Sequence, residues 1–319
     1  MAGSDGIERR SRLTAVPSDR SCGRWRALRP PAVAAALTAA VFAPALWNGF
    51  VWDDQFNLVD NPRYRGLGWP QLRWMLTTNR LTHPGLGGQW IPVTWISLGV
   101  DYLVWGMNPL GYHLTNVLLH AADAALFLLV ARRLLARALP SAGAPLVDLG
   151  AGAAALFFAL HPLRAESVAW ATERRDVLSG LFFLLAVLLY LRAVDAEGRV
   201  RARRLGASVG CYALALASKS IVMTLPLVLL VLDAWPLRRL GRGRWRVALL
   251  EKLPYFVLAV AGAALAFVAA RTGSALSSLA SLSWPARIAI AAHSLWFYAW
   301  KTFVPLTLSP LYEMPARVD

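Results

Sequence analysis

Residues 173–193 read ERRDVLSGLFFLLAVLLYLRA, so four charged residues stand directly before an apolar run. The apolar part, 177–193, is long enough to cross the hydrocarbon core of a bilayer, about 30 Å thick, as a helix. A bilayer core offers no water to the backbone, so such a run must satisfy its own hydrogen bonds. The stretch predicts a membrane-spanning helix with a charged segment at one end.

Similar apolar runs recur along nearly the whole chain. Of its 319 residues, 57% are hydrophobic and 16% are charged, whereas a soluble domain carries about 25% charged residues. Hydropathy predicts eight spans, near 31–51, 111–131, 146–161, 177–193, 205–218, 220–235, 253–270 and 286–304. The sequence thus predicts an all-α polytopic membrane protein, with 1–30 as a disordered basic cytoplasmic tail and 31–319 as the transmembrane domain.

The net charge of +15 does not indicate nucleic acid binding. Arginines and lysines stand in short clusters between apolar spans rather than along one soluble face. The two cysteines, Cys22 and Cys211, lie far apart in the sequence and predict neither a disulfide framework nor a metal site.

The distribution of basic residues predicts the orientation of the chain. With the N-terminus in the cytoplasm, the cytoplasmic segments hold 21 basic residues and the opposite segments hold 10, although the latter are longer in total. This is the asymmetry of the positive-inside rule. The loop 52–110, the segment 161–177 and the turn 218–220 are therefore expected to share one outer compartment, where they can meet.

The long loop 52–110 is not a plain hydrophilic linker, because it is punctuated by Trp69, Trp74, Trp90, Trp95 and Trp105. Its stretches 69–77 and 91–105 are predicted to form short amphipathic helices in the membrane interface, where tryptophan is favoured. Most of these tryptophans can equally be explained as simple anchors of the loop.

Two adjacent carboxylates, Asp53 and Asp54, follow the first apolar run. Like charges side by side at a membrane surface raise one pKa, which suits a general base or a cation site. The alternative is an ordinary acidic cap at the end of a helix.

A second polar group lies between the third and fourth spans. It consists of His161, Arg164, Glu166, Glu173, Arg174, Arg175 and Asp176. On one continuous helix, Glu166 and Glu173 would share a face, as would Arg164 and Arg175. Arginine forks bind phosphate oxygens, and Lys219, between two serines at the tip of the 205–235 hairpin, could assist. A structural salt-bridge network and a snorkelling lysine are the alternatives.

Other charges are predicted within the spans themselves, at Asp123, Asp233, His293 and Lys301. Asp233 stands beside several arginines and reads as a cytoplasmic anchor, while Asp123 is expected to face the bundle interior. Asp123, His293 and Lys301 would be translocation residues if the chain were a non-catalytic lipid or polysaccharide transporter. Charges concentrated at the outer rim favour an enzyme instead, acting on a substrate with a charged head group and a lipid tail.

Six motifs carry a resemblance to a known family. They are 50–54 (FVWDD), 111–120 (GYHLTNVLLH), 159–170 (ALHPLRAESVAW), 173–176 (ERRD), 218–219 (SK) and 308–312 (LSPLY). With them the chain resembles, from about residue 45 to 312, the transmembrane and tetratricopeptide-repeat family and its bacterial relatives, which are similar to protein O-mannosyltransferases of the GT-C fold.

The resemblance implies a GT-C-type glycosyltransferase in a bacterial inner membrane. Such an enzyme moves a sugar, mannose for example, with inversion from a polyprenyl-phosphate donor to a hydroxyl of a protein or glycan at the periplasmic face. It further implies that Asp53 and Asp54 include the general base, and that Arg174, Arg175 and Lys219 hold the donor phosphate. The sequence does not decide whether a metal is needed: paired carboxylates can bind Mg²⁺ or Mn²⁺, but arginine and lysine can also neutralise a lipid monophosphate leaving group.

Two departures from the family pattern stand out. Ser220 occupies the position after Lys219 where an acidic residue is expected, and relatives continue past residue 319 into further spans and repeats. The transmembrane domain is accordingly expected to be incomplete at its C-terminus, and an inactive scaffold subunit is the remaining alternative function.

Overall fold

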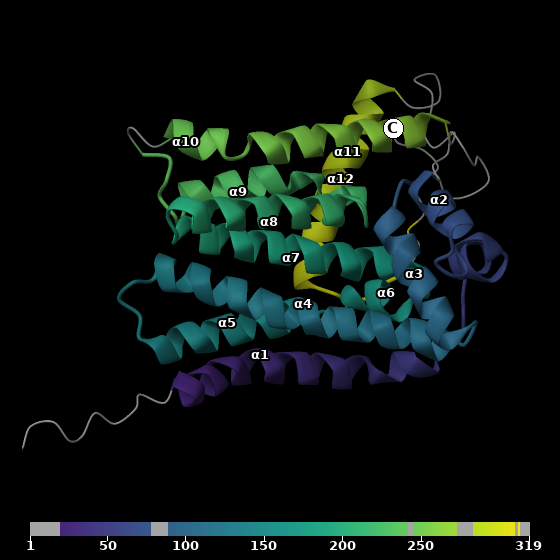
Figure 1. The fold of residues 1–319 in the computed structure, drawn as a ribbon, viewed down its shortest axis with the longest axis horizontal. Helices are drawn as coiled ribbons and strands as arrows, with labels where there is room; N and C mark the ends of the chain where they lie inside the picture. Colours follow the sequence, from purple (N-terminus) through teal and green to yellow (C-terminus); the bar gives the residue numbers. More distant parts are fainter. Residues whose placement is uncertain (1–19, 78–88, 242–244, 273–282, 310–311, 313–319) are drawn as a thin grey trace, which may run out of the picture.

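The computed structural model describes residues 20–77, 89–241, 245–272, 283–309 and 312, and within them it contains helices and no strand (Figure 1). The α-helices are α1 (Arg20–Phe42), α2 (Trp69–Thr77), α3 (Pro92–Trp105), α4 (Pro109–Ala138), α5 (Ala144–Leu160), α6 (Arg164–Ala169), α7 (Arg174–Val194), α8 (Gly198–Leu216), α9 (Leu225–Ala234), α10 (Trp245–Leu250), α11 (Leu253–Thr272) and α12 (Trp284–Phe303). The prediction of an all-α fold is confirmed.

Each of the eight predicted windows is largely helical. Within the described ranges, four helical segments are long and apolar enough to cross a membrane, namely Arg29–Trp47, Pro109–Ala138, Ala171–Val194 and Trp245–Arg271. The segments Ala144–Leu160 and Ser220–Ala234 are apolar but shorter. α8 and α12 cover the other two windows, so a total of eight spans stays a prediction. α1 already begins at Arg20, inside the segment expected to be a tail, and residues 1–19 lie outside the described residues.

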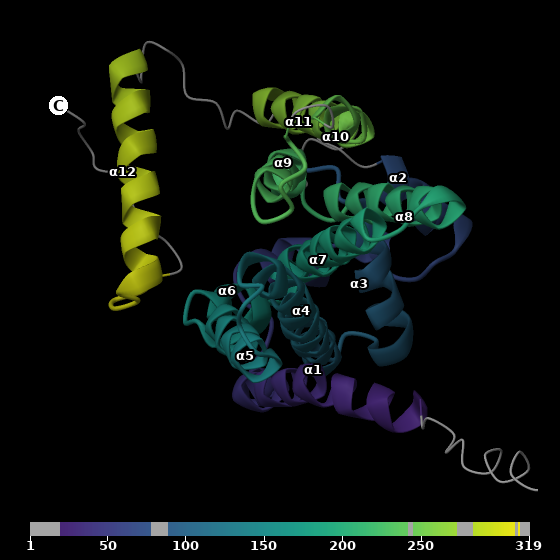
Figure 2. The same ribbon diagram turned by 90° about the vertical axis from the view of Figure 1, so that its left-hand side faces the viewer.

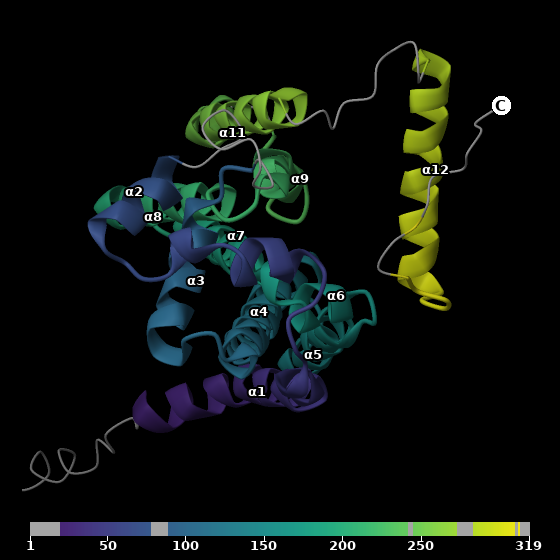
Figure 3. The same ribbon diagram turned by 90° about the vertical axis from the view of Figure 1, so that its right-hand side faces the viewer.

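The long helices run side by side as a bundle, with α2, α3 and α6 gathered near one end (Figure 1). α7 packs on α8, and α4 packs on α1, α5 and α7. α12 stands to one side of this bundle (Figures 2 and 3). Helices form at both loop stretches expected to be helical, as α2 and α3, while their position in a membrane interface stays a prediction.

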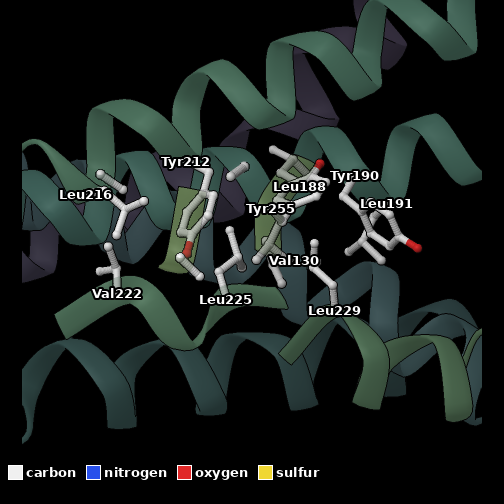
Figure 4. Close-up of a cluster of buried hydrophobic side chains, with 14 residues drawn as sticks. Val130, Leu188, Tyr190, Leu191, Tyr212, Leu216, Val222, Leu225, Leu229 and Tyr255 are labelled. Atoms are coloured by element: carbon white, nitrogen blue, oxygen red, sulfur yellow. The ribbon is translucent and has the colours of Figure 1, made fainter. Parts of the chain in front are cut away.

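The largest core joins α4, α7, α8, α9 and α11 (Figure 4). Its fully buried side chains include Tyr190, Tyr212 and Tyr255, and the last two rings lie 5.8 Å apart. In lipid, packing of this kind is the main attraction between helices, because lipid tails are as apolar as the side chains. The core therefore fixes the α8–α9 hairpin against α7, and so places the hairpin tip beside the first turn of α7.

A buried ionic network closes the opposite end of the bundle. Asp233, on α9, pairs with Lys252 and with Arg239, and the Tyr190 hydroxyl donates a 2.6 Å hydrogen bond to its carboxylate. Asp233 and Lys252 have no exposed surface. Asp233 thus anchors helix ends, as the sequence predicted.

Candidate functional site

The segments expected to share one compartment do meet at one end of the bundle. The Thr94 hydroxyl of α3 donates a 3.0 Å hydrogen bond to the carbonyl oxygen of Ser218 at the hairpin tip. Asp54 of the first loop contacts Thr172 of the segment before α7. These contacts assemble the loop 52–110, the segment 161–177 and the turn 218–220 into one polar region.

The two adjacent aspartates have opposite environments. Asp54 has no exposed surface. One of its oxygens accepts hydrogen bonds from the Thr172 backbone N–H (2.7 Å) and hydroxyl (2.5 Å), and the other accepts one from the Val51 N–H (3.0 Å). Asp53 is exposed, and its carboxylate makes no hydrogen bond or ion pair with another described residue. Its charge does act on the guanidinium of Arg175.

Trp52, directly before this pair, adopts a left-handed backbone conformation with φ of +53°. For a bulky residue that conformation is unusual and costs about 1–2 kcal/mol. The Trp52 ring contacts the Trp170 ring edge-on, with centroids 5.9 Å apart. This tertiary contact helps offset the strain of a turn after which Asp53 is exposed and Asp54 is buried.

The polar segment between the third and fourth predicted spans does not form one helix. α6 ends at Ala169, Trp170 is extended, and α7 begins at Arg174 after one short helical turn. The expectation that Glu166 and Glu173 share one helix face is therefore wrong, as is its counterpart for Arg164 and Arg175. The break places the Thr172 N–H and hydroxyl where Asp54 accepts them.

Arg174 is fully buried. Its guanidinium donates to Asn116, to Ser97 (2.8 Å), to Asp101 (2.5 Å) and to the Tyr112 carbonyl oxygen (2.9 Å), so four of its five N–H groups are used. None of these partners belongs to the charged segment that contains Arg174. The observed contacts make Arg174 the link between the start of α7 and helices α3 and α4.

Arg175 and Lys219 lie closer to the surface, with side chains 20% and 19% exposed. Glu173 lies between them: one of its oxygens accepts from Arg175 and the other accepts from Lys219 at 3.0 Å. Lys219 also pairs with Asp176, whose second oxygen accepts from the Ser167 hydroxyl at 3.0 Å. The geometry leaves three N–H donors of Arg175 and one of Lys219 for an external anion.

Glu166 is exposed at the edge of this group. Partial burial, followed by the negative charges of Glu173 and Asp176, raises the pKa of the Glu166 carboxyl above its ordinary value. Lys219 and Arg175 act in the opposite direction and do not cancel these effects.

His161 and Arg164 serve local structure in the same segment. The Leu163 N–H donates to Nδ1 of His161, so Nε2 carries the proton and donates to the Thr302 carbonyl oxygen at 2.9 Å. This bond fastens the end of α12 to the start of the segment. Arg164 lies over the Phe158 ring, 4.7 Å from its centroid.

A cavity of about 700 Å³ opens beside the acidic pair. Its walls include Trp52 and Trp170 from the loops, Glu166 from α6, and Tyr298 and Tyr312 from the α12 region. Asp53 itself is not among the lining residues, and neither are Arg174, Arg175 and Lys219. Of the predicted site residues, Glu166 lines this cavity, while the proposed base and the three cations lie outside its lining.

Several site residues were missed from the sequence. Asp101 carried a usable signal, because an acid within an otherwise apolar helix needs a buried partner. Thr172 and Tyr298 carried none, since their roles depend on segments far away in the sequence.

The residues expected to serve a transporter are not joined by any contact. Asp123 is buried on α4, as predicted, and its Oδ1 has no hydrogen-bond partner among the described residues. His293 is exposed on α12. Lys301 donates to the Leu306 carbonyl oxygen at 2.5 Å, so it caps the end of α12.

Comparison with known proteins identifies relatives of this chain. It is 38% identical over 160 residues to protein O-mannosyl-transferase Tmtc1 of Drosophila melanogaster, covering 49% of this chain and 17% of that protein. It is 39% identical over 118 residues to the Xenopus laevis protein O-mannosyl-transferase tmtc2, covering 37% of this chain and 13% of the relative. A third relative, Drosophila protein O-mannosyl-transferase Tmtc2, matches 62% of this chain at 34% identity, with 21% of its own length covered.

The resemblance seen in the motifs is confirmed. Over about half its length, this chain is similar to protein O-mannosyl-transferases at 32–38% identity. It spans only about a fifth or less of the length of these relatives. No family model matches the chain, and no solved structure matches it.

Proposed function

We propose that this chain is the catalytic part of a membrane glycosyltransferase. It moves a sugar from a polyprenyl-phosphate donor to an acceptor hydroxyl, and the proposed acceptor is a protein. The observation that carries the proposal is the division of roles between two neighbouring aspartates. Asp54 is locked by three donors, while Asp53 is left exposed and without a hydrogen-bonding partner among the described residues. Similarity to protein O-mannosyl-transferases supports mannose as the sugar.

Asp53 is proposed as the general base. An alcohol is a poor nucleophile at neutral pH, and a positioned carboxylate that takes its proton as the new bond forms contributes about 10²–10⁴-fold. The hydroxyl oxygen attacks the anomeric carbon opposite the phosphate, the carbon–oxygen bond to the phosphate breaks, and polyprenyl phosphate leaves. The configuration at that carbon is thereby inverted.

Arg175 and Lys219 are proposed to neutralise the leaving phosphate. Both are part-exposed and retain donors that Glu173 and Asp176 do not use, whereas Arg174 is enclosed by protein groups. An arginine fork can bind two phosphate oxygens at once. Arg174 is accordingly assigned a positioning role and is no longer proposed as a phosphate ligand.

The aromatic cavity beside Asp53 is proposed to receive the reacting sugar and the acceptor hydroxyl. Trp52 and Trp170 offer flat apolar walls, and Glu166 is a carboxyl able to hydrogen-bond a sugar hydroxyl. Pockets of a few hundred Å³ with apolar walls and few polar groups are typical small-molecule sites. Of the described residues, no group of three or more His, Cys, Asp or Glu side chains is arranged to hold a metal ion.

The test is transfer of labelled mannose from polyprenyl-phosphate mannose to protein in membranes from cells that express the chain. Asp53→Asn keeps the size of the side chain but cannot accept a proton, so transfer should fall by at least about 100-fold while donor binding by the purified protein is retained. Asp60→Asn, which removes another exposed carboxylate of the same loop, is the matched control and should transfer at the parent rate. Parent-rate transfer by Asp53→Asn would show that this carboxylate is not the base.

A further inference from the structure

A second cavity lies at the end of the bundle opposite the acidic pair. It measures about 460 Å³ and is formed by the C-terminal ends of α4 and α7 and the first half of α8. α7 has its Arg174 end at the polar region described above and its Arg192 end here, about 30 Å apart for a helix of 21 residues. Nothing in the proposed transfer reaction uses this second cavity.

Its lining is strongly basic. The charged lining residues are Arg133, Arg192, Asp195, Arg203 and Arg204, above an apolar floor of Leu189 and Ala207. The single carboxylate is already shared: Asp195 accepts from Arg133 at 3.2 Å and from Arg137 at 2.5 Å. Four guanidinium groups therefore line one cavity, and the one carboxylate that lines it with them is already ion-paired.

Three of these arginines have no anionic partner in the part of the chain that the structure describes. Arg192 and Arg203 are exposed and make no ion pair there. Arg204 donates a 2.7 Å hydrogen bond to the Arg192 carbonyl oxygen, which fixes it against the last turn of α7. Arginines that only mark the cytoplasmic side would spread around the bundle, whereas these point from three helices into one concavity.

The size and setting of the cavity select the ligand. It exceeds the space that one phosphate ion needs, and its apolar floor suits the first carbons of a lipid rather than water. The positive-inside asymmetry places this end at the cytoplasmic leaflet, where basic pockets between transmembrane helices bind anionic head groups. Arginine forks bind phosphate oxygens bidentately.

We propose that this cavity is a binding site for the phosphate-bearing head group of an anionic phospholipid, such as phosphatidylglycerol. The bound phosphodiester accepts hydrogen bonds from Arg192 and Arg203 and neutralises the repulsion among the four guanidinium groups. Its glycerol and first acyl carbons cover Leu189 and Ala207. The lipid thereby joins the cytoplasmic ends of α4, α7 and α8.

The experiment is a titration of the purified full chain in neutral detergent with phosphatidylglycerol, phosphatidylcholine or inorganic phosphate at constant ionic strength. Unfolding temperature and lipid retention in native mass spectrometry are the two readouts. Phosphatidylglycerol should raise the unfolding temperature and be retained, whereas phosphatidylcholine and inorganic phosphate should do neither. Equal effects of phosphatidylcholine would overturn the anionic site, and an equal effect of inorganic phosphate would overturn the lipid as its ligand.

Matched variants separate the cavity from general surface charge. The double variant Arg192→Gln/Arg203→Gln should weaken phosphatidylglycerol binding at least tenfold. Arg199→Gln/Arg238→Gln removes two exposed arginines at the same end but outside the cavity, and should leave binding unchanged. Equal weakening by both pairs would overturn the proposal.

The double variant Arg192→Lys/Arg203→Lys keeps the positive charges and is the control for misfolding. It should bind phosphatidylglycerol with an affinity between those of the parent and the glutamine variant. Binding with the parent affinity would count against the site.

Discussion

Asp54 and Thr172 are 118 residues apart in the sequence, yet one carboxylate oxygen of Asp54 accepts both the backbone N–H and the hydroxyl of Thr172, at 2.7 and 2.5 Å. Both side chains are buried. The bond pair ties the first loop to the turn that precedes α7. It thereby determines where exposed Asp53 lies relative to Arg175, and so the layout of the candidate site depends on it.

Thr172→Val should destabilise the chain. Valine has the shape of threonine but cannot donate, and a hydrogen bond to a charged group is worth about 1.5–3 kcal/mol. The backbone N–H of residue 172 remains, so the loss should stay within that range. The free energy of unfolding in detergent measures it. Thr302→Val, whose hydroxyl donates only to Tyr298 within its own helix, is the control and should change stability by less than about 0.5 kcal/mol.

Arg174 and Arg175 are neighbours with different roles, and the same substitution should separate them. Arg174→Lys removes the buried fork that reaches Asn116 and Asp101, so stability should fall by about 2–4 kcal/mol while folded protein binds the donor normally. Arg175→Lys should cost little stability but weaken binding of the polyprenyl-phosphate donor. Donor affinity and unfolding free energy, measured for both variants, decide this. The opposite pattern would return the phosphate role to Arg174.

Local sequence signals were enough to predict the helices, and the distribution of basic residues was enough to predict that the loop 52–110, the segment 161–177 and the turn 218–220 can meet. Apolar runs are a property of the neighbouring sequence, so every predicted window is found helical, as are the loop segments that became α2 and α3. The number of spans was less accessible, since α5 and α9 are short and α8 begins with several arginines. For such helices, packing against neighbouring helices, rather than composition, decides how deeply they lie in the membrane.

The hydrogen-bond and ion-pair partners of the site residues could not be predicted from local sequence signals. Arg174 pairs with Asp101, 73 residues away, and a charge pattern does not reveal which acid reaches which base. The break at Trp170 was inaccessible for the same reason, because it accompanies hydrogen bonds of Thr172 to Asp54, 118 residues away. The sequence nevertheless placed Asp53, Arg175 and Lys219 in one region.

Glu166 should make stability depend on pH. Its pKa is raised in the folded protein above the ordinary value of 4.5, so its favourable contribution is complete below that value and is lost as the pH rises through the folded pKa. Glu166→Gln should therefore unfold at a higher temperature than the parent at pH 7, with the difference vanishing near pH 4. Thermal unfolding from pH 3.5 to 8 tests this. Asp60→Asn controls for the loss of a negative charge, and a difference independent of pH would contradict the explanation.

The orientation of the chain can be tested with single cysteines. After Cys22 and Cys211 are replaced by serine, Asp60→Cys should react with an impermeant thiol reagent on intact cells. Arg199→Cys should react only after the cells are permeabilised. Both positions are exposed, so access to the compartment and not burial decides the result. The reverse pattern would move the polar region, and the proposed site with it, to the cytoplasmic face.

Trp52 should prove dispensable for stability and necessary for transfer. Glycine accepts a φ of +53° without cost, so Trp52→Gly relieves about 1–2 kcal/mol of backbone strain. It also loses the edge contact with Trp170, worth about 0.5–1.5 kcal/mol, so the unfolding free energy should change little.

The same substitution removes one wall of the cavity in which we place the sugar, and transfer should drop at least tenfold. Arg238 also has a positive φ, of 50°, and lies outside both cavities. Arg238→Gly relieves a similar strain while raising the entropy of the unfolded chain, so it should change stability by less than about 1 kcal/mol and leave transfer unaffected. If Trp52→Gly kept full transfer activity, the strained tryptophan would be a structural device only, and the sugar would have to bind elsewhere.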